Sequence, residues 1–164
     1  ASVYHMKARL PNTEALLVDP GAITNLAGDR WVSRVARLAK AHGYDVKLSP
    51  LERKINVEGV GKGSQQCLNS ASIPRATAIG PMSHFKTPVV PNSDIPGLLG
   101  LEELKARNCL LDCKRGYLYE LDGEYQLNAG PGTKRHVMQP AMSGHWMLPI
   151  AEFAKRTHYN MNMQ

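Results

Sequence analysis

The sequence of 164 residues has the length of about one domain, and its 43% hydrophobic and 21% charged residues exclude a wholly disordered chain. The formal net charge of +6 at pH 7 favours acidic partners but does not identify them. Three cysteines are present, Cys67, Cys109 and Cys113. They are too few and odd in number for a disulfide scaffold, so we expect reduced thiols in a reducing interior.

We expect no membrane span, because the longest apolar runs are strand-sized and fall far short of the ~18 residues that a membrane helix needs. The sequence opens at Ala1 without an initiator methionine or an apolar leader. This favours a fragment, a product cut from a longer precursor, or a mature chain after removal of a targeting peptide. The compartment itself is not predicted, and an organelle reached through such a peptide fits this expectation.

The first predicted elements are a short strand and a helix. The apolar run 15–18 favours a strand that ends at the turn 19–21. Asp29 is a candidate N-cap, and Gly43 a candidate C′ residue, of the helix between them. Apolar residues recur there at helical spacing, at Trp31, Val35, Leu38 and Ala39. The opposite face carries three arginines, Arg30, Arg34 and Arg37. We interpret this stripe as a solvated face, since it lacks the interleaved aromatic residues of a nucleic-acid site.

A glycine-tipped hairpin and further strands follow the helix. Residues 55–58 and 67–73 predict two strands joined by the glycine-rich segment 59–63. Neither a Lys-Ser/Thr pair nor a helix start follows, so this segment is a poor phosphate-binding loop. The remaining predicted elements are a strand at 85–90, a short helix at 101–107 stopped by Asn108, and strands at 109–112 and 117–121. The pattern predicts a mainly β protein with two helices.

The C-terminal part differs from the rest, because after Gly123 the pattern weakens into extended chain rich in proline and glycine, with a terminal amphipathic stretch at 150–156. We predict a domain at 1–125 and an extended docking segment at 126–164. That segment carries too many apolar side chains to leave in water. We therefore expect Trp146 or Phe153 to contact another chain, and packing wholly on the same domain is the alternative.

Three motifs occur in an informative order. They are Leu16-Leu17-Val18-Asp19-Pro20-Gly21-Ala22, Val57-Glu58-Gly59-Val60-Gly61-Lys62-Gly63 and Leu98-Leu99-Gly100-Leu101-Glu102-Glu103-Leu104. Their order and spacing resemble the active-site loop, the flap and the psi-loop of retropepsin-like aspartic proteases. The resemblance is closer to the protease-like regions of copia-type retroelement polyproteins, including those of algal protists, and it is carried by the segments 9–11, 93–101 and 143–149. The resemblance covers roughly residues 9–153.

The resemblance implies a closed, mostly antiparallel β-fold that works as a homodimer. It also implies the site residues: catalytic Asp19 with Pro20, Gly21 and Ala22 in the active-site loop, Gly59, Val60 and Gly61 in the flap, and Leu98, Leu99 and Gly100 in the psi-loop. Each subunit would contribute one aspartate. In the dimer, the two carboxylates would lie close together and share a proton. One would then act as a base on a water molecule while the other protonates the peptide carbonyl.

Pro20 departs from the family pattern, in which a threonine or serine follows the aspartate and braces the two active-site loops across the dimer. Proline has neither a hydroxyl nor a backbone N–H, and each lost hydrogen bond is worth ~1 kcal/mol. The sequence therefore favours a catalytically silent, retroelement-derived pseudoenzyme that acts as a structural or interaction subunit of a larger assembly, which can be organellar. The alternative is an active homodimeric aspartic endopeptidase cut from a polyprotein.

No metal and no cofactor are predicted. Neither the pair Cys109 and Cys113 nor the pair His136 and His145 has the spacing of a zinc site. A basic nucleic-acid-binding module is a third functional class, and scattered charge with only 6% aromatic residues argues against it. Protein subunits are the expected partners.

Overall fold

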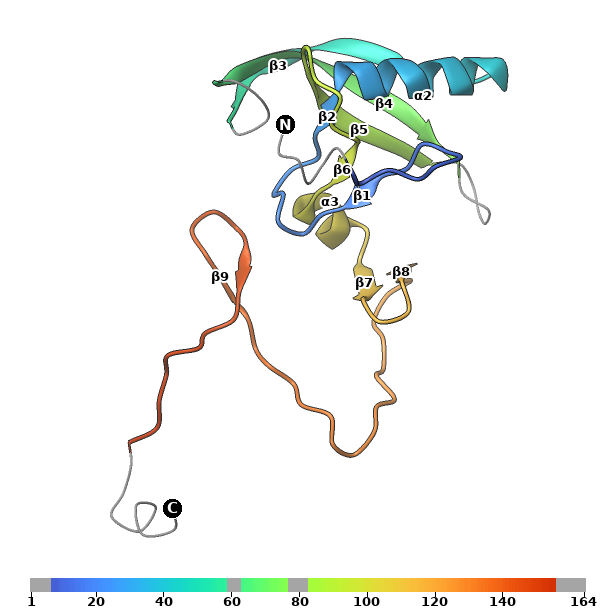
Figure 1. Ribbon diagram of the computed structural model, residues 1–164. Helices are drawn as coiled ribbons and strands as arrows, with labels where there is room; N and C mark the ends of the chain where they lie inside the picture. The colour runs from blue at the N-terminus through green and yellow to red at the C-terminus, as the bar shows by residue number, and fades with distance from the viewer. Residues whose placement is uncertain (1–6, 59–62, 77–82, 156–164) are drawn as a thin grey trace. The chain divides into compact units, whose positions relative to one another are not determined.

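The computed structural model describes residues 7–58, 63–76 and 83–155 (Figure 1). The chain divides into two compact units, Ala1–Tyr125 and Gln126–Gln164. Strands predominate in the described residues, and the two helices are α2 (Asp29–Ala41) and α3 (Leu101–Ala106). This mainly β architecture is consistent with a retropepsin-like fold. No helix in these ranges is long and apolar enough to cross a membrane.

A four-stranded sheet forms the main layer of the first unit. Its strands are, in spatial order, β2 (Ala27–Gly28), β5 (Ser83–Val90), β4 (Gln65–Arg75) and β3 (Lys47–Val57). β3 and β4 form the predicted antiparallel hairpin, with Val57 opposite Gln65. The register shifts between Pro50 and Ile55, so the predicted strand at 55–58 is the end of a longer, irregular one. β5 pairs antiparallel with β4, whereas β2 runs parallel to β5.

Helix α2 ends as its sequence predicts. Gly43 adopts a positive φ of 83°, a conformation that glycine reaches without steric cost. The Gly43 N–H donates to the Lys40 carbonyl oxygen at 3.0 Å, and the Tyr44 N–H donates to the Ala39 carbonyl oxygen at 2.9 Å. This pair of bonds is the Schellman arrangement, which satisfies carbonyl groups of the last helical turn.

The predicted N-cap of α2 is wrong by one residue. Gly28 is the N-cap, and Asp29 is already helical. The two carboxylate oxygens of Asp29 instead accept hydrogen bonds from the backbone N–H groups of Asn92 and Ser93, each at 3.0 Å. These two donors come from the turn after β5, which the sequence around Asp29 cannot reveal. The side chain therefore joins the helix start to the far end of β5.

The hydrophobic core of the first unit lies between α2, the sheet and the region of β6 (Leu98–Leu99) and α3. Trp31 on α2 and Phe85 on β5 are buried and pack edge to face, with ring centroids 6.3 Å apart and planes at 84°. Leu99 and Leu104 belong to the same buried cluster. The half-buried Leu16 packs against this cluster.

Two further strand pairs belong to the first unit. β1 (Leu17–Val18) runs parallel to β6 (Leu98–Leu99). β7 (Cys109–Asp112) and β8 (Tyr117–Glu120) form the predicted antiparallel hairpin. Within the described ranges, the strands do not close into a barrel, and two pairs are parallel. The fold is therefore more open than the closed antiparallel sheet that the resemblance implies.

The second unit is extended chain with one small hairpin. β9 (Gln139–Pro140) and β10 (Trp146–Met147) pair antiparallel. Gly144, with a φ of 92°, lies in the turn between them. No other helix or strand occurs in residues 126–155, the described part of this unit. The amphipathic stretch that begins at Ile150 is accordingly not helical as far as it is described.

Candidate active site

The loop that carries Asp19 begins where β1 ends. The Leu17 N–H donates to the Gly97 carbonyl oxygen at 2.8 Å, and the Asp19 N–H donates to the Leu99 carbonyl oxygen at 2.9 Å. These bonds anchor the base of the loop to β6. Asp19 is half-buried, and the two residues after it are exposed. The structure therefore brings the predicted active-site loop and the predicted psi-loop at 98–100 together.

The Asp19 side chain folds back on its own loop. Its Oδ1 accepts a hydrogen bond from the Gly21 N–H at 3.0 Å, and the Ala22 N–H donates to the Asp19 carbonyl oxygen at 3.1 Å. Aspartate favours this kind of turn, in which its side-chain oxygen accepts a hydrogen bond from the backbone N–H two residues later. Pro20 lies within it and has no N–H and no side-chain donor. The carboxylate of Asp19 is thus held within its own loop, while Pro20 offers no hydrogen-bond donor to a second loop.

The same loop satisfies the start of α3. The Leu101 N–H donates to the Ala22 carbonyl oxygen at 2.7 Å, and the following helix N–H donates to the Ile23 carbonyl oxygen at 2.9 Å. Helix N–H groups in the first turn have no partner within the helix, so the loop supplies one. A Cβ on Gly100 would lie 2.5 Å from the Thr24 carbonyl carbon. This close approach explains why the motif needs glycine before the helix.

Asn25 is a site residue that the sequence analysis missed. Its buried side chain donates from Nδ2 to the Lys86 carbonyl oxygen at 2.9 Å and accepts from the Gly100 N–H at Oδ1 at 2.8 Å. It therefore joins the chain after the active-site loop to β5 and to the residue before α3. The partners are 61 and 75 residues away in the sequence, so no local signal could have identified it.

Arg34 does not belong to a solvated stripe, and that interpretation is wrong for this residue. Its Nε donates to Glu14 Oε1 at 2.8 Å, and its Nη1 donates to Asp94 Oδ1 at 2.7 Å. The pKa of Arg34 is raised, and the hydrogen bond with Glu14 is the largest cause. Asp94 raises the pKa further, whereas burial of the guanidinium lowers it. Arg30 and Arg37 are exposed, as expected of a solvated face.

The other predicted site residues lie elsewhere. Gly59, Val60 and Gly61, the predicted flap, lie outside the described residues. Trp146 and Phe153 belong to the second unit, where both are exposed and Phe153 has 86% of its surface accessible. The structure thus brings together two of the three motifs that carried the resemblance.

Peptide hydrolysis at this loop needs a second carboxylate. A proton can be shared only when two acids lie close together, and one chain supplies Asp19 alone in the predicted role. A second copy of the loop would have to provide the other aspartate. Across the three described ranges, no group of three or more His, Cys, Asp or Glu side chains could hold a metal ion.

Comparison with known proteins finds similarity among solved structures alone. No protein-family model matches the sequence, and no curated protein is similar to it. Among solved structures, the chain is similar to the retroviral protease-like domain of Ddi1 from Leishmania major, with 21% sequence identity and a TM-score of 0.42. The similarity covers 64% of this chain and 76% of that one. It says nothing about activity or partners.

Proposed function

We propose that this chain is a retropepsin-like domain that no longer cuts peptides and acts as a structural or interaction subunit of a larger assembly. The observation that carries the proposal is the exposure of large apolar side chains along residues 126–155. They are Leu127, Val137, Met138, Met142, Trp146, Met147, Leu148, Ile150 and Phe153. Burying each large apolar side chain would contribute about 1.5–3 kcal/mol.

These side chains need a surface that the segment does not provide by itself. Its described strands are one pair of two residues each, and proline and glycine recur along it, which disfavours a longer regular element. Soluble monomers rarely leave so much apolar surface in water. We take Trp146 and Phe153 as the anchors, since large aromatic side chains dominate binding energy at protein interfaces, and the methionines fill irregular gaps.

Catalytic silence is supported by the loop itself. Pro20 is exposed and lacks both donors that could reach a second loop. A homodimer would lose hydrogen bonds of ~1 kcal/mol each from both copies. Misplacing a reacting group by about 1 Å can cost a factor of about one hundred in rate. A loop without its brace is therefore poorly suited to catalysis.

An active homodimeric endopeptidase is the second candidate, and one observation favours it. Asp19 is half-buried at the end of β1, and its carboxylate is held by the Gly21 N–H. That placement would let two copies of the loop face each other. This candidate requires a dimer, whereas the interaction subunit requires unrelated partner chains.

Native mass spectrometry of the complex from its source cell separates the two candidates. We expect one copy with unrelated chains, and we expect the double variant Trp146→Asp, Phe153→Asp to leave the complex while the first unit remains folded. Leu48→Asp is the matched control, because Leu48 is 65% exposed on β3 and lies outside the docking segment. Unchanged assembly of the double variant would refute the interaction role, and a homodimer joined at Asp19 would favour the protease.

A further inference from the structure

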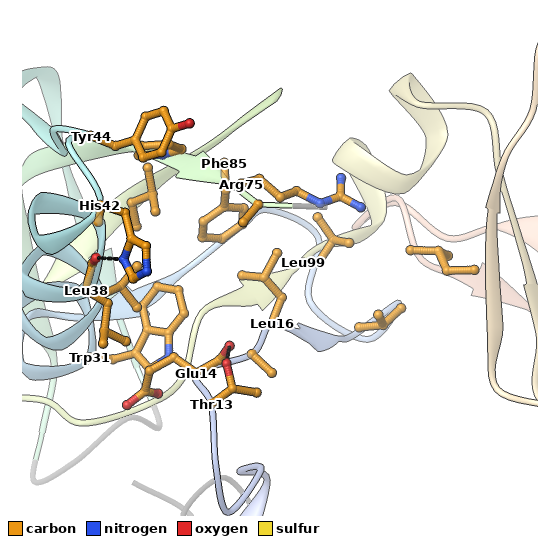
Figure 2. Close-up of a pocket in the computed structure, with 18 residues that line it drawn as sticks. Thr13, Glu14, Leu16, Trp31, Leu38, His42, Tyr44, Arg75, Phe85 and Leu99 are labelled. Atoms are coloured by element: carbon orange, nitrogen blue, oxygen red, sulfur yellow. Dashed lines mark hydrogen bonds between the residues drawn. The ribbon is translucent and has the colours of Figure 1, made fainter. Parts of the chain in front are cut away.

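A groove in the first unit lies between α2 and the sheet and opens onto the hydrophobic core (Figure 2). Its volume is about 990 Å³, and its lining is mainly apolar. The floor consists of core residues, among them Trp31, Phe85 and Leu99. At the rim, Leu38 and Tyr44 are 50% and 46% exposed. At this groove, the side chains that cover the core are therefore themselves half-exposed.

The charged groups of the groove are already paired. Glu14 binds Arg34 at 2.8 Å, and Arg75 binds Glu120 at 2.7 Å. The Nδ1 atom of His42 is hydrogen-bonded to a carbonyl oxygen one turn earlier in α2 at 2.9 Å. An ionised occupant would therefore lose its hydration without gaining an unpaired partner charge. The lining favours an uncharged, apolar occupant.

One polar atom of the lining is not satisfied. The indole nitrogen Nε1 of Trp31 is buried and has no hydrogen-bond partner within the described part of the chain. Trp31 itself is only 3% exposed, and Figure 2 shows its indole beside Glu14 and Leu16 on one wall of the groove. A buried donor without an acceptor is unfavourable. An occupant that brings an acceptor to this wall would remove that cost.

We propose that the groove binds an uncharged, apolar peptide segment of a protein partner, with a backbone carbonyl accepting the Trp31 Nε1–H. A small-molecule site usually encloses 70–90% of its ligand, whereas this groove is open along Leu38 and Tyr44. A peptide also carries a carbonyl group at every residue. Because Nε1 is shielded in the free chain, the carbonyl reaches it only when a neighbouring side chain changes rotamer.

The groove belongs to the first unit. Every lining residue lies between Thr13 and Leu118, within the first unit. Loss of peptide binding at the groove would therefore leave the interaction role of the second unit standing. The converse also holds, so the two proposals can fail independently.

Peptides selected from a random display library on the full chain test the groove. We expect the selected peptides to be apolar and uncharged. In fluorescence polarisation with the synthetic peptides, Leu38→Glu should weaken binding by about tenfold or more. Leu48→Glu should leave it unchanged, because Leu48 is exposed on β3 and does not line the groove. Equal loss in both variants, peptides rich in charge, or no peptide sensitive to Leu38→Glu would overturn the proposal.

The indole N–H provides a second, independent readout. On saturation with a selected peptide, the Trp31 indole N–H resonance, assigned through Trp146→Phe, should move downfield as the hydrogen bond forms. Trp31→Phe, checked for an unchanged circular dichroism spectrum, should weaken binding about three- to tenfold. An unmoved indole resonance would refute the carbonyl contact. If sedimentation shows that Leu38→Glu turns a dimer into a monomer, a second copy fills the groove and the peptide proposal falls.

Discussion

Pro20 is the residue at which the catalytic question can be decided. If the missing brace alone prevents catalysis, Pro20→Thr should gain measurable hydrolysis of a peptide library, provided that the chain dimerises. The assay should span roughly pH 4–7, since coupled acids titrate as a pair. Adding Asp19→Asn to this variant should abolish the activity. Hydrolysis by the natural chain that Asp19→Asn abolishes would instead identify an active protease.

Gly100 offers a steric prediction at the same scale. Because a Cβ there would lie 2.5 Å from the Thr24 carbonyl carbon, Gly100→Ala should lower the free energy of unfolding by about 1–3 kcal/mol. Gly130→Ala is the control, since nothing lies within 4 Å of a Cβ at Gly130. Urea unfolding followed by circular dichroism measures both. Equal midpoints for the two variants would show that the chain around Thr24 can move aside.

At the scale of elements, Arg34 connects three parts of the first unit. Its guanidinium joins α2 to Glu14, which precedes β1, and to Asp94, which precedes β6. Arg9 binds the same Asp94 carboxylate at 3.2 Å. Arg34→Gln should therefore lower the free energy of unfolding by about 1 kcal/mol. Arg37→Gln, an exposed position on the same helix, should change it much less. Equal effects in urea unfolding would mean that the ion pairs contribute nothing.

The β7–β8 hairpin should respond to acid through Asp112. Hydrogen bonds from the backbone N–H and the guanidinium of Arg115, and from the Lys114 N–H, lower the pKa of Asp112. A lowered pKa stabilises the folded turn above the ordinary aspartate value of about 4, and this stabilisation is lost as pH falls through the folded value. NMR shifts of the hairpin amides should follow this titration. Asp112→Asn should remove it, and an identical titration in that variant would contradict the assignment.

Which elements the sequence could predict depends on how far apart their determinants lie. The hairpin at 109–112 and 117–120 is specified by two short apolar runs around a turn with Gly116 at a φ of 72°, and all of this is local. The parallel pairing of β2 with β5 and the hydrogen bonds of Asn25 depend on residues more than sixty positions away. Single-sequence patterns carry no information about such partners, so these features appear only in the structure.

For the whole molecule, the division into two units has a direct test. A fragment of residues 1–125 contains the whole buried cluster around Trp31 and Phe85. It should fold and unfold at the same urea concentration as the full chain. Differential scanning calorimetry should show a single cooperative transition for the fragment. A large drop in its midpoint would mean that residues 126–164 contribute to the stability of the first unit.

The distant pairing of β1 with β6 has a consequence for how the chain comes to fold. The hydrogen bond between Asn25 and Gly100 closes a loop of 75 residues, and contacts of such high sequence separation slow folding. During synthesis, β1 would leave the ribosome long before β6 exists. Leu16 and Leu17 would then remain without their native cover until Leu98 and Leu99 have been made. The nascent chain is therefore expected to need chaperone protection in this interval, more than the finished protein does.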